Sequence, residues 1–415
     1  MTRDLRWNLA ALGADYGLFV VGLSFASQST ILPAFAAHLD APNVVVGAIP
    51  AVMTIGWLLP SLPAAGHTET LARKLPFVLR YTVWERVPFV GLALGAFFLA
   101  ARAPALTLGL LLLTLLVVTG VGGVLLPAWM DIIGRAIPVT LRGRFFALAN
   151  LGASVAGFAG GLLTERVLAA VPPPAGYGVV FLLTAACMAA SFVALTLVRE
   201  PPAAGTAAAV PLRAYLARVP ALLRREPNLR MFLGARACSV VAQMGGAFYT
   251  VHALRVWEPP ASEVGVFTAL LLGGQAVGNA ALGWIADRAG HRPVLVAGVA
   301  ATLAANVVAL GASSLGAFGA VFVLAGINIA ALSVSSLPIL LEFAPTPAAR
   351  PTYVGLGATA LAPVAFLAPL AAGLLADAVG LPAVFAAAAL AGAAALALLV
   401  WGVRDPRAIA RDRAC

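Results

Sequence analysis

The chain has 415 residues, of which 62% are hydrophobic and only 10% are charged. A soluble globular protein carries about a quarter charged residues, so this composition excludes that class. The formal net charge of +10 is compatible with nucleic-acid binding, but basic residues in a membrane protein first report its topology. The three cysteines have no paired spacing and no neighbouring histidines, so we expect no disulfide, no metal site and no cofactor.

Apolar stretches long enough to cross about 30 Å of hydrocarbon recur along the whole chain. In the first half we predict membrane-spanning helices at Leu9–His38, Val44–Gly66, Pro76–Ala101, Leu106–Trp129, Phe145–Ala170 and Val179–Val198. In the second half we predict them at Met231–Leu254, Val264–Ala286, Val294–Ala312, Leu315–Leu341, Val354–Ala376 and Pro382–Val403. The first stretch is too long for a signal peptide and lacks a small-residue cleavage site, so it is expected to remain as a helix. The predicted fold is an all-α integral membrane protein of twelve helices in two six-helix bundles.

The arginines are distributed unevenly between the predicted loops. With the N-terminus in the cytoplasm, nearly all of them fall in cytoplasmic segments, and the opposite face keeps only Arg102, Arg166 and Arg255. This asymmetry is typical of the positive-inside rule and fits an even number of crossings. We therefore expect a multi-pass protein of the bacterial inner membrane with both termini in the cytoplasm, embedded in the lipid bilayer and without a nucleic-acid partner.

The longest hydrophilic segment, residues 199–229, separates the predicted bundles at 1–198 and 230–415. Its second part places apolar residues near helical spacing, with arginines between them: Leu212, Leu216, Val219 and Leu223. This pattern predicts a short amphipathic helix on the cytoplasmic surface. The alternative is a flexible linker whose arginines only fix the topology.

The loop after the eighth predicted helix reads GWIADRAGHRP. Gly283 would permit close helix approach, and Gly290 would permit the chain to reverse. Asp287 can accept hydrogen bonds from a neighbouring helix N-terminus, while Arg288 and Arg292 stay at the cytoplasmic surface. This loop resembles that of the major facilitator superfamily, in which it latches the two halves in one access state. The resemblance extends over the whole chain by helix count and topology, and it is closest to the bacterial drug and metabolite efflux members.

The corresponding loop of the first half is a degenerate relative of this motif. Glu69 stands where the family has its aspartate, and Arg73 follows one helical turn later. The second glycine is absent, so the two loops are not expected to latch equally. The alternative interpretation is an ordinary charged turn.

The fifth predicted helix contains the run GRFFALANLGASVAGFAGG, which follows the glycine spacing of the antiporter motif in the same superfamily. The Gly-Pro at the centre of the family motif is replaced here by Ala-Gly, so generic small-residue packing is an open alternative to a hinge. The fourth helix lacks the arginine that the family associates with proton transfer. The candidate packing or hinge residues are Gly152, Gly157, Gly160, Gly161 and, in the eleventh helix, Pro369.

Polar residues inside the membrane are candidates for the transport pathway, because burying them in lipid is costly. Asp15 lies in the first helix and Arg236 in the seventh, and the family fold places both helices around a central cavity. We predict an ion pair between them that breaks on opening. Alternatively, Arg236 snorkels to the headgroups and Asp15 meets Arg142 or Arg144.

Other intramembrane polar residues carry weaker signals. Adjacent Glu85 and Arg86 in the third helix are expected to form a structural pair and not a relay. Uncharged residues can either contact substrate or form hydrogen bonds between helices. The uncharged candidates are Gln28, Asn150, Gln243, Gln275, Asn279, Asn306 and Asn328.

The family resemblance implies a midplane substrate site and alternating access by rocking of two bundles. We expect a monomeric secondary transporter that exports a small, largely apolar molecule coupled to protons, since no cluster of buried cations suits an anion. Uptake of a small metabolite is the first alternative, and a non-transporting receptor is the second. No metal-spaced histidines or nucleophile elbow indicate an enzyme.

Overall fold

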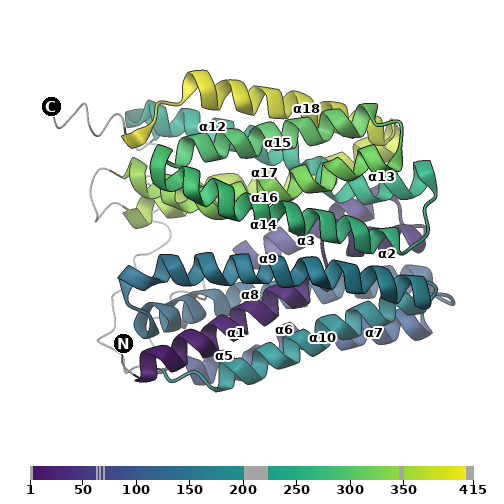
Figure 1. Cartoon of the computed structure of the whole chain (residues 1–415), viewed down its shortest axis with the longest axis horizontal. Helices are drawn as coiled ribbons and strands as arrows, with labels where there is room; N and C mark the ends of the chain where they lie inside the picture. The colour runs from purple at the N-terminus through teal and green to yellow at the C-terminus, as the bar shows by residue number, and fades with distance from the viewer. Residues whose placement is uncertain are drawn as a thin grey trace. The chain divides into compact units, whose positions relative to one another are not determined.

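The computed structural model describes residues 3–61, 64, 67–68, 71–200, 223–344 and 350–407. Within these residues all regular secondary structure is helical, and the chain divides into two units (Figure 1). Unit 1 comprises Met1–Ala209 and Leu254–Ala269, and unit 2 comprises Val210–Ala253 and Leu270–Cys415. Glu69 and most of the predicted amphipathic helix of the linker lie outside the described residues. The predicted bundle limits stay a prediction.

The helices before the linker are α1 (Arg3–Phe25), α2 (Ile31–His38), α3 (Asn43–Leu58), α5 (Leu75–Tyr81), α6 (Val83–Arg86), α7 (Pro88–Phe98), α8 (Pro104–Ala136), α9 (Val139–Ala170) and α10 (Ala175–Thr196). Those after it are α12 (Pro227–Ala242), the 3₁₀ turn η1 (Gln243–Ala247), α13 (Phe248–Trp257), α14 (Glu263–Ala289), α15 (His291–Gly311), α16 (Leu315–Phe343), α17 (Arg350–Ala378), α18 (Leu381–Ala397) and the π-helical turn η3 (Leu398–Gly402).

Among the described residues, nine helices are long and apolar enough to cross a membrane, and α3 is a shorter apolar helix. The two remaining predicted crossings are broken helices, α5 to α7 and α12 to α13. Large apolar side chains such as Leu148, Val277 and Leu390 are about 70% exposed, as expected for side chains that face lipid. The predicted all-α fold with twelve crossings is confirmed.

The first predicted span is not one helix but two, α1 and α2, separated by residues 26–30. Hydroxyl residues in this segment compete with helical hydrogen bonding by forming local bonds. The Ser29 N–H donates to Ser27 Oγ at 3.4 Å, and the Leu32 N–H donates to the Ser27 carbonyl at 3.0 Å. Pro33 lies in the first turn of α2, where a missing N–H costs nothing. Gln28 is exposed within this break.

The third predicted span is interrupted at Thr82 and Val87, which leaves α6 as a single turn between α5 and α7. Pro88 begins α7 and has no N–H with which to continue the helical bonding of the preceding turn. The interruption places Glu85 and Arg86 on α6, and both side chains are buried. A buried turn with two opposite charges marks this region as a site that needs explanation.

The seventh predicted span breaks at η1, between α12 and α13. Asn306 of α15 supports this break, because its side-chain amide donates to the freed Ala242 carbonyl at 3.1 Å. Its oxygen accepts from the Tyr249 hydroxyl at 2.9 Å. A Cβ on Gly245 would lie 2.7 Å from this Asn306 oxygen, so only glycine fits there without movement of the amide.

Both units contain the same clamp between the first and last helices of their half. In unit 1 the Asn8 side chain donates to the Arg199 carbonyl and accepts from the Arg199 N–H, both at 2.9 Å. In unit 2 Asn228 makes the same two bonds with the backbone of Arg404, also at 2.9 Å. The clamped arginines lie in the sequences VREP and VRDP. This repeated detail supports the two halves as structural repeats.

Candidate functional site

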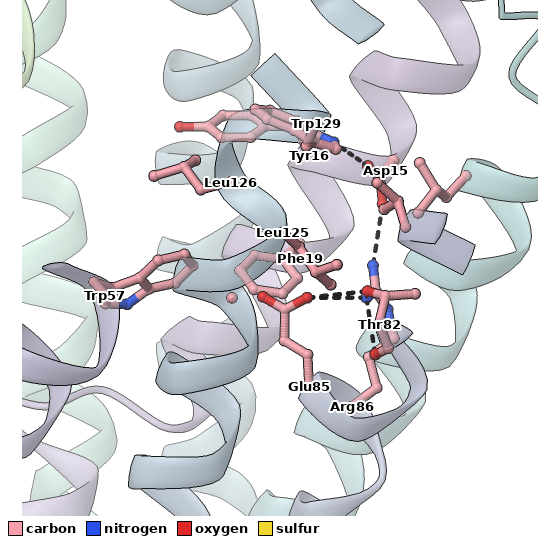
Figure 2. A pocket seen from close by; sticks show the side chains of 13 residues that line it. Asp15, Tyr16, Phe19, Trp57, Thr82, Glu85, Arg86, Leu125, Leu126 and Trp129 are labelled. Carbon is pink, nitrogen blue, oxygen red and sulfur yellow. Dashed lines mark hydrogen bonds and ion pairs between the residues drawn. The ribbon is translucent and has the colours of Figure 1, made fainter. Parts of the chain in front are cut away.

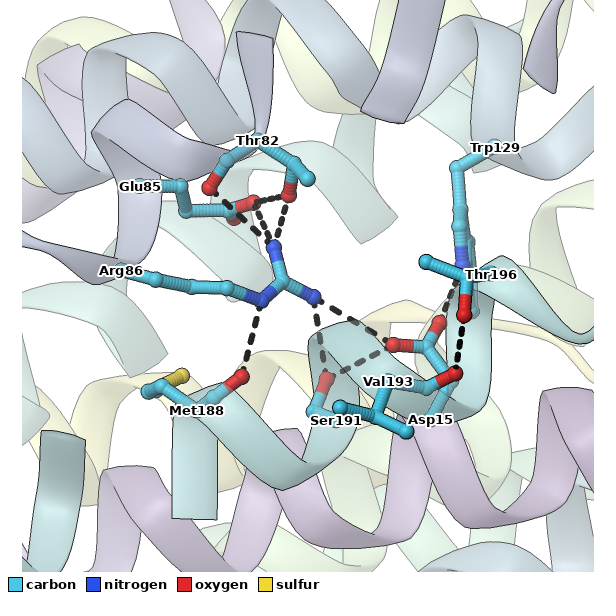
Figure 3. A network of polar contacts seen from close by, with 9 residues as sticks. All are labelled: Asp15, Thr82, Glu85, Arg86, Trp129, Met188, Ser191, Val193 and Thr196. Atoms are coloured by element: carbon cyan, nitrogen blue, oxygen red, sulfur yellow. Dashed lines mark hydrogen bonds and ion pairs between the residues drawn. The ribbon is translucent and has the colours of Figure 1, made fainter. Parts of the chain in front are cut away.

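The interior of unit 1 contains a buried polar network centred on Arg86 (Figure 3). Its Nη2 lies 3.3 Å from Asp15 Oδ1, and its Nη1 lies 3.3 Å from Glu85 Oε2. Each of these three side chains is less than a tenth exposed. One guanidinium is therefore shared by two carboxylates.

Neighbouring helices hold the guanidinium in place. Arg86 Nε donates to the Met188 carbonyl at 3.0 Å, and Nη2 donates to Ser191 Oγ at 2.9 Å, both on α10. Nη1 donates to the hydroxyl and carbonyl of Thr82, at the start of α6. The ring of Phe19 lies 5.6 Å from the guanidinium carbon. Because these bonds leave each guanidinium nitrogen with a partner, Arg86 is fixed as a structural cation.

The two carboxylates differ in how many donors they receive. Asp15 accepts from Ser191 Oγ at 2.7 Å and from Trp129 Nε1 at 3.0 Å, in addition to its bond from Arg86. Glu85 accepts from Thr82 Oγ1 at 3.0 Å and from Arg86, both on Oε2. Its Oε1 receives no hydrogen bond from the part of the chain that the structure describes. Asp15 is thus satisfied as an anion, whereas Glu85 has an oxygen left for a proton or a ligand.

Glu85 lines a cavity of about 120 Å³ inside unit 1 (Figure 2). Tyr16 forms part of its wall, stacks on Trp129 with ring centroids 5.8 Å apart, and donates from its hydroxyl to Asn150 Oδ1 at 2.8 Å. The other walls are mainly aromatic or aliphatic: Phe19, Trp57, Leu125, Leu126 and Trp129. The cavity has room for a small, mostly apolar group next to the charged network.

Gly122 of α8 leaves the room that Glu85 requires. A Cβ at this position would lie 2.7 Å from both Glu85 Oε1 and the Trp57 ring. At Gly123 a Cβ would lie 2.5 Å from the Gly56 carbonyl oxygen, so the backbones of α3 and α8 approach closely here. The glycine pair therefore sets both the helix spacing and the free face of Glu85.

The charge balance of the network suits proton exchange. With both carboxylates ionised, Asp15, Glu85 and Arg86 carry a net charge of −1, and a single proton makes the group neutral. When both carboxylates are ionised, their negative charges repel each other and only one of them is neutralised by Arg86. A net charge inside a membrane is also costly, so the state with one protonated carboxylate is favoured. The arrangement can bind and release a proton without losing the Asp15–Arg86 pair.

Within unit 1, Asp15 has a partner that the sequence did not predict. The structure pairs it with Arg86, and the predicted ion pair with Arg236 stays a prediction. The alternative partner Arg142 instead donates to the carbonyls of Ile137 and Gly134. Glu85 and Arg86 do form the expected pair, but sequence reasoning missed that Arg86 also binds a carboxylate 71 positions away.

Arg236 lies on α12 in unit 2 and is buried. Its one hydrogen bond with the described residues of unit 2 is at 3.4 Å to Ser239 Oγ, on the same helix, and none of these residues provides a carboxylate partner. Gln243, at the start of η1, donates to the Ser239 carbonyl at 2.9 Å.

The remaining uncharged candidates do not gather into one group. Asn150 joins the wall of the unit 1 cavity through Tyr16. Asn279 of α14 accepts from Ser333 Oγ at 3.3 Å, and Gln275, one turn earlier, is half-buried. Asn328 of α16 is buried, and its side-chain oxygen has no hydrogen-bond partner among the described residues. Their roles in substrate binding stay predictions.

The predicted loop of the second half bends at Gly290, whose φ of 90° favours glycine, directly before α15. Arg292 donates to the carbonyls of Leu399 and Val400 in η3, at 3.1 and 2.7 Å. Arg288 lies over the ring of Trp284 at 4.0 Å. In unit 2 this loop is therefore tied to the end of the last helix.

Two predicted details of the loops are not seen. Asp287 is exposed and accepts no hydrogen bond from the described residues, and a Cβ at Gly283 would meet no atom within 4 Å, so close helix approach does not occur there. In the first-half loop Arg73 is exposed, while its neighbour Lys74 is buried and pairs with Asp131 at 2.7 Å. The role of Arg73 in this loop stays a prediction, and the ion pair of Lys74 was not predicted.

The candidate hinge helices are continuous, since α9 and α17 run without interruption, the latter with Pro369 inside it. Gly152 is exposed with open space around it, which differs from the predicted packing face. Gly157 is buried. Tight packing occurs at Gly160, where a Cβ would lie 3.2 Å from a ring atom of α1, and at Gly161, where it would lie 2.5 Å from the Ala269 backbone nitrogen.

Comparison with known proteins gives a family match over part of the chain and a fold. Residues 232–414 match the sequence model of the Major Facilitator Superfamily. None of the curated proteins compared with the sequence matches it.

Solved structures match over nearly the whole chain at low identity. A variant of the nucleoside transporter NupG is 13% identical with a TM-score of 0.71, over 94% of this chain and 98% of its own. A D-xylose–proton symporter is 15% identical with a TM-score of 0.68, over 96% and 98%. A bacterial homologue of the human lysosomal transporter Spinster, inward-facing and unoccupied, is 16% identical with a TM-score of 0.66, over 99% and 98%.

Proposed function

We propose that the chain is a transporter of the major facilitator superfamily, and more narrowly a secondary transporter driven by protons. Its fold and the match of residues 232–414 to the model of this family, whose members are transporters and not enzymes, support this. Its substrate is a small, largely apolar molecule that it exports by alternating access. The observation that carries this proposal is the buried network of Asp15, Glu85 and Arg86 beside an apolar cavity.

Each acidic residue has its own role in this proposal. Asp15 neutralises Arg86 permanently, because three donors hold its carboxylate. Glu85 carries the exchanged proton, because its Oε1 faces the cavity. Protonation removes the net charge of the network and lowers the cost of enclosing it, so the proton favours one access state over the other. Proton coupling in a structural neighbour, the D-xylose–proton symporter, supports this reading.

We further propose that the protein resides as a monomer in the bacterial inner membrane, with both termini in the cytoplasm. The uneven distribution of arginines supports this orientation. Alternating access would move two six-helix bundles, residues 1–198 and 230–415, against each other. The loop that contains Asp287 and Arg288 and its first-half counterpart would latch one access state, and the glycines of α9 together with Pro369 would form the moving contacts.

The test is flux in proteoliposomes with an imposed proton gradient, measured across a panel of small labelled compounds. We expect the wild type to accumulate at least one compound against its gradient. Glu85→Gln, which imitates the protonated state, should lose this accumulation but keep gradient-independent exchange of internal for external substrate. Asp4→Asn is the matched control, since Asp4 is an exposed carboxylate that pairs with Arg199 outside the network.

Two outcomes would contradict the proposal. Unchanged proton-driven accumulation by Glu85→Gln would remove Glu85 from coupling. Saturable binding without flux across the whole panel would favour a non-transporting receptor. The direction is decided in oriented membrane vesicles: proton antiport predicts accumulation in everted, acid-inside vesicles, whereas accumulation only in right-side-out vesicles would favour uptake.

A further inference from the structure

Arg236 is a buried cation whose charge is not balanced by any carboxylate of unit 2 that the structure describes. It is 7% exposed and has one hydrogen bond, to Ser239 Oγ at 3.4 Å. Arg86 in unit 1 has the same burial, yet two carboxylates, two hydroxyls and two carbonyls hold it. Arg236 therefore has N–H donors left to bind something else.

A buried guanidinium without a counter-ion is expensive, because burial removes the water that would otherwise solvate it. Such a group is retained where an anion completes it during function. Packing alone does not explain why an arginine occupies position 236, since a neutral side chain of similar size would fill the same space with a smaller desolvation penalty.

The surroundings of Arg236 favour a ligand site. Ser239 of α12 and Gln243, the residue directly after α12, follow Arg236 by three and seven positions, which places all three on the same side of this helix. This face leads to the helix break at η1, where the amide of Asn306 holds the freed Ala242 carbonyl. Helix breaks of this kind occur in transporters where the chain borders a substrate site.

We propose that Arg236 binds an oxyanion, the carboxylate or phosphate group of the transported molecule, with Ser239 and Gln243 as additional hydrogen-bonding groups. This inference rests on the proposed transport function and narrows its substrate class to apolar molecules with one acidic group. A guanidinium suits this role because its planar N–H donors match two oxygens of one anion.

The experiment measures binding without any proton gradient. Thermal unfolding of the purified protein is followed in phosphatidylcholine nanodiscs with benzoate, phenyl phosphate or, as the uncharged match, benzyl alcohol. The variants are Arg236→Gln, which removes the charge, and Arg236→Lys, which keeps it. Nanodiscs that contain phosphatidylglycerol separate a soluble anion from a lipid headgroup.

We expect Arg236→Gln to unfold at a higher temperature than the wild type in the absence of anions, because the unpaired charge is gone. Benzoate or phenyl phosphate should raise the unfolding temperature of the wild type, and Arg236→Lys should retain part of the effect. In Arg236→Gln, binding should weaken at least about tenfold.

Several results would overturn the inference. One is a lower unfolding temperature for Arg236→Gln without anions, which would mean that the charge is structurally paired. Others are equal stabilisation by benzyl alcohol and benzoate, or no stabilisation by either anion. Stabilisation by phosphatidylglycerol alone would assign the site to a lipid headgroup. Proton-driven flux without anion binding would leave the proposed transport function intact and contradict only this inference. Anion binding at Arg236 without proton-driven flux would support the anion site and contradict the proposed transport function.

Discussion

The two units are alike at one end and different in their interiors. Asn8 and Asn228 make the same pair of backbone bonds, with Arg199 and Arg404 respectively. Inside, unit 1 surrounds Arg86 with two carboxylates, whereas Arg236 of unit 2 has only a weak bond to a serine. A clamp between first and last helices serves the stability of either repeat, so both retain it. In the proposed mechanism the internal charges serve proton coupling in unit 1 and anion binding in unit 2, so the two repeats divide these tasks between them.

The largest expected effect concerns the unequal roles of the two carboxylates in unit 1. Asp15→Asn leaves Arg86 buried with a weakened partner, so it should reduce the free energy of unfolding by about 3–5 kcal/mol. Glu85→Gln keeps the shape of the side chain and leaves the Asp15–Arg86 pair intact, so its cost should stay below about 1 kcal/mol. Unfolding by titration with SDS in mild detergent measures both variants.

Equal losses for the two variants would show that the network does not distinguish Asp15 from Glu85. The interior of unit 2 provides a contrast, since Arg236→Gln is expected to lose no stability at all. If Arg236→Gln lowered the free energy of unfolding by as much as is expected for Asp15→Asn, the charge of Arg236 would be balanced within the protein. The two units would then not differ in this respect.

The next effect tests the space beside Glu85. Gly122→Ala would place a Cβ 2.7 Å from both Glu85 Oε1 and the Trp57 ring. Overpacking of this kind costs about 1–3 kcal/mol, and it should also reduce proton-driven flux because the free face of Glu85 is blocked. Gly120→Ala is the matched control, since a Cβ there meets no atom within 4 Å. If the two variants behave alike in stability and flux, Gly122 does not shape the site.

Much of the fold could be predicted from the sequence, because membrane-spanning length and charge asymmetry are local properties. The helix breaks were the main omission. Hydroxyl residues at 27–30, Pro88 and the Gly245–Gly246 pair all occur in stretches whose hydropathy stays high, so the apolar signal continues through each interruption. Local hydrogen bonding and missing N–H groups decide where these helices stop, and hydropathy does not report either.

The candidate site could be predicted only in part. Asp15 and Glu85 are recognisable as charges in apolar stretches. The bond between Asp15 and Arg86 joins residues 71 positions apart and depends on the break that creates α6, so no spacing rule reveals it. Gly122 lies in a glycine-rich stretch of the sequence, whereas its closeness to Glu85 and Trp57 depends on the packing of α3 against α8.

A smaller effect is expected at the shared clamp. Asn8→Ala removes two hydrogen bonds from a buried position and should cost about 2 kcal/mol. Asn228→Ala removes the equivalent bonds of unit 2, which are exposed to solvent, so it should cost less than about 1 kcal/mol. The ranking is measured by the same SDS titration. A larger loss for Asn228→Ala would indicate that the clamp matters more in unit 2.

The smallest effect concerns the contact of the C-terminal segment with unit 2. Arg407 Nε donates to Glu342 Oε1 at 2.6 Å, but the arginine side chain is 37% exposed. Partly exposed ion pairs contribute about 0–1 kcal/mol, and salt screens them, so Arg407→Gln should cost little at low ionic strength and nothing at high salt. Arg404→Gln is the control, because Arg404 is exposed and its clamp uses only backbone atoms. A salt-independent loss for Arg407→Gln as large as that of Asn8→Ala would make this contact a second clamp, which unit 2 alone would possess.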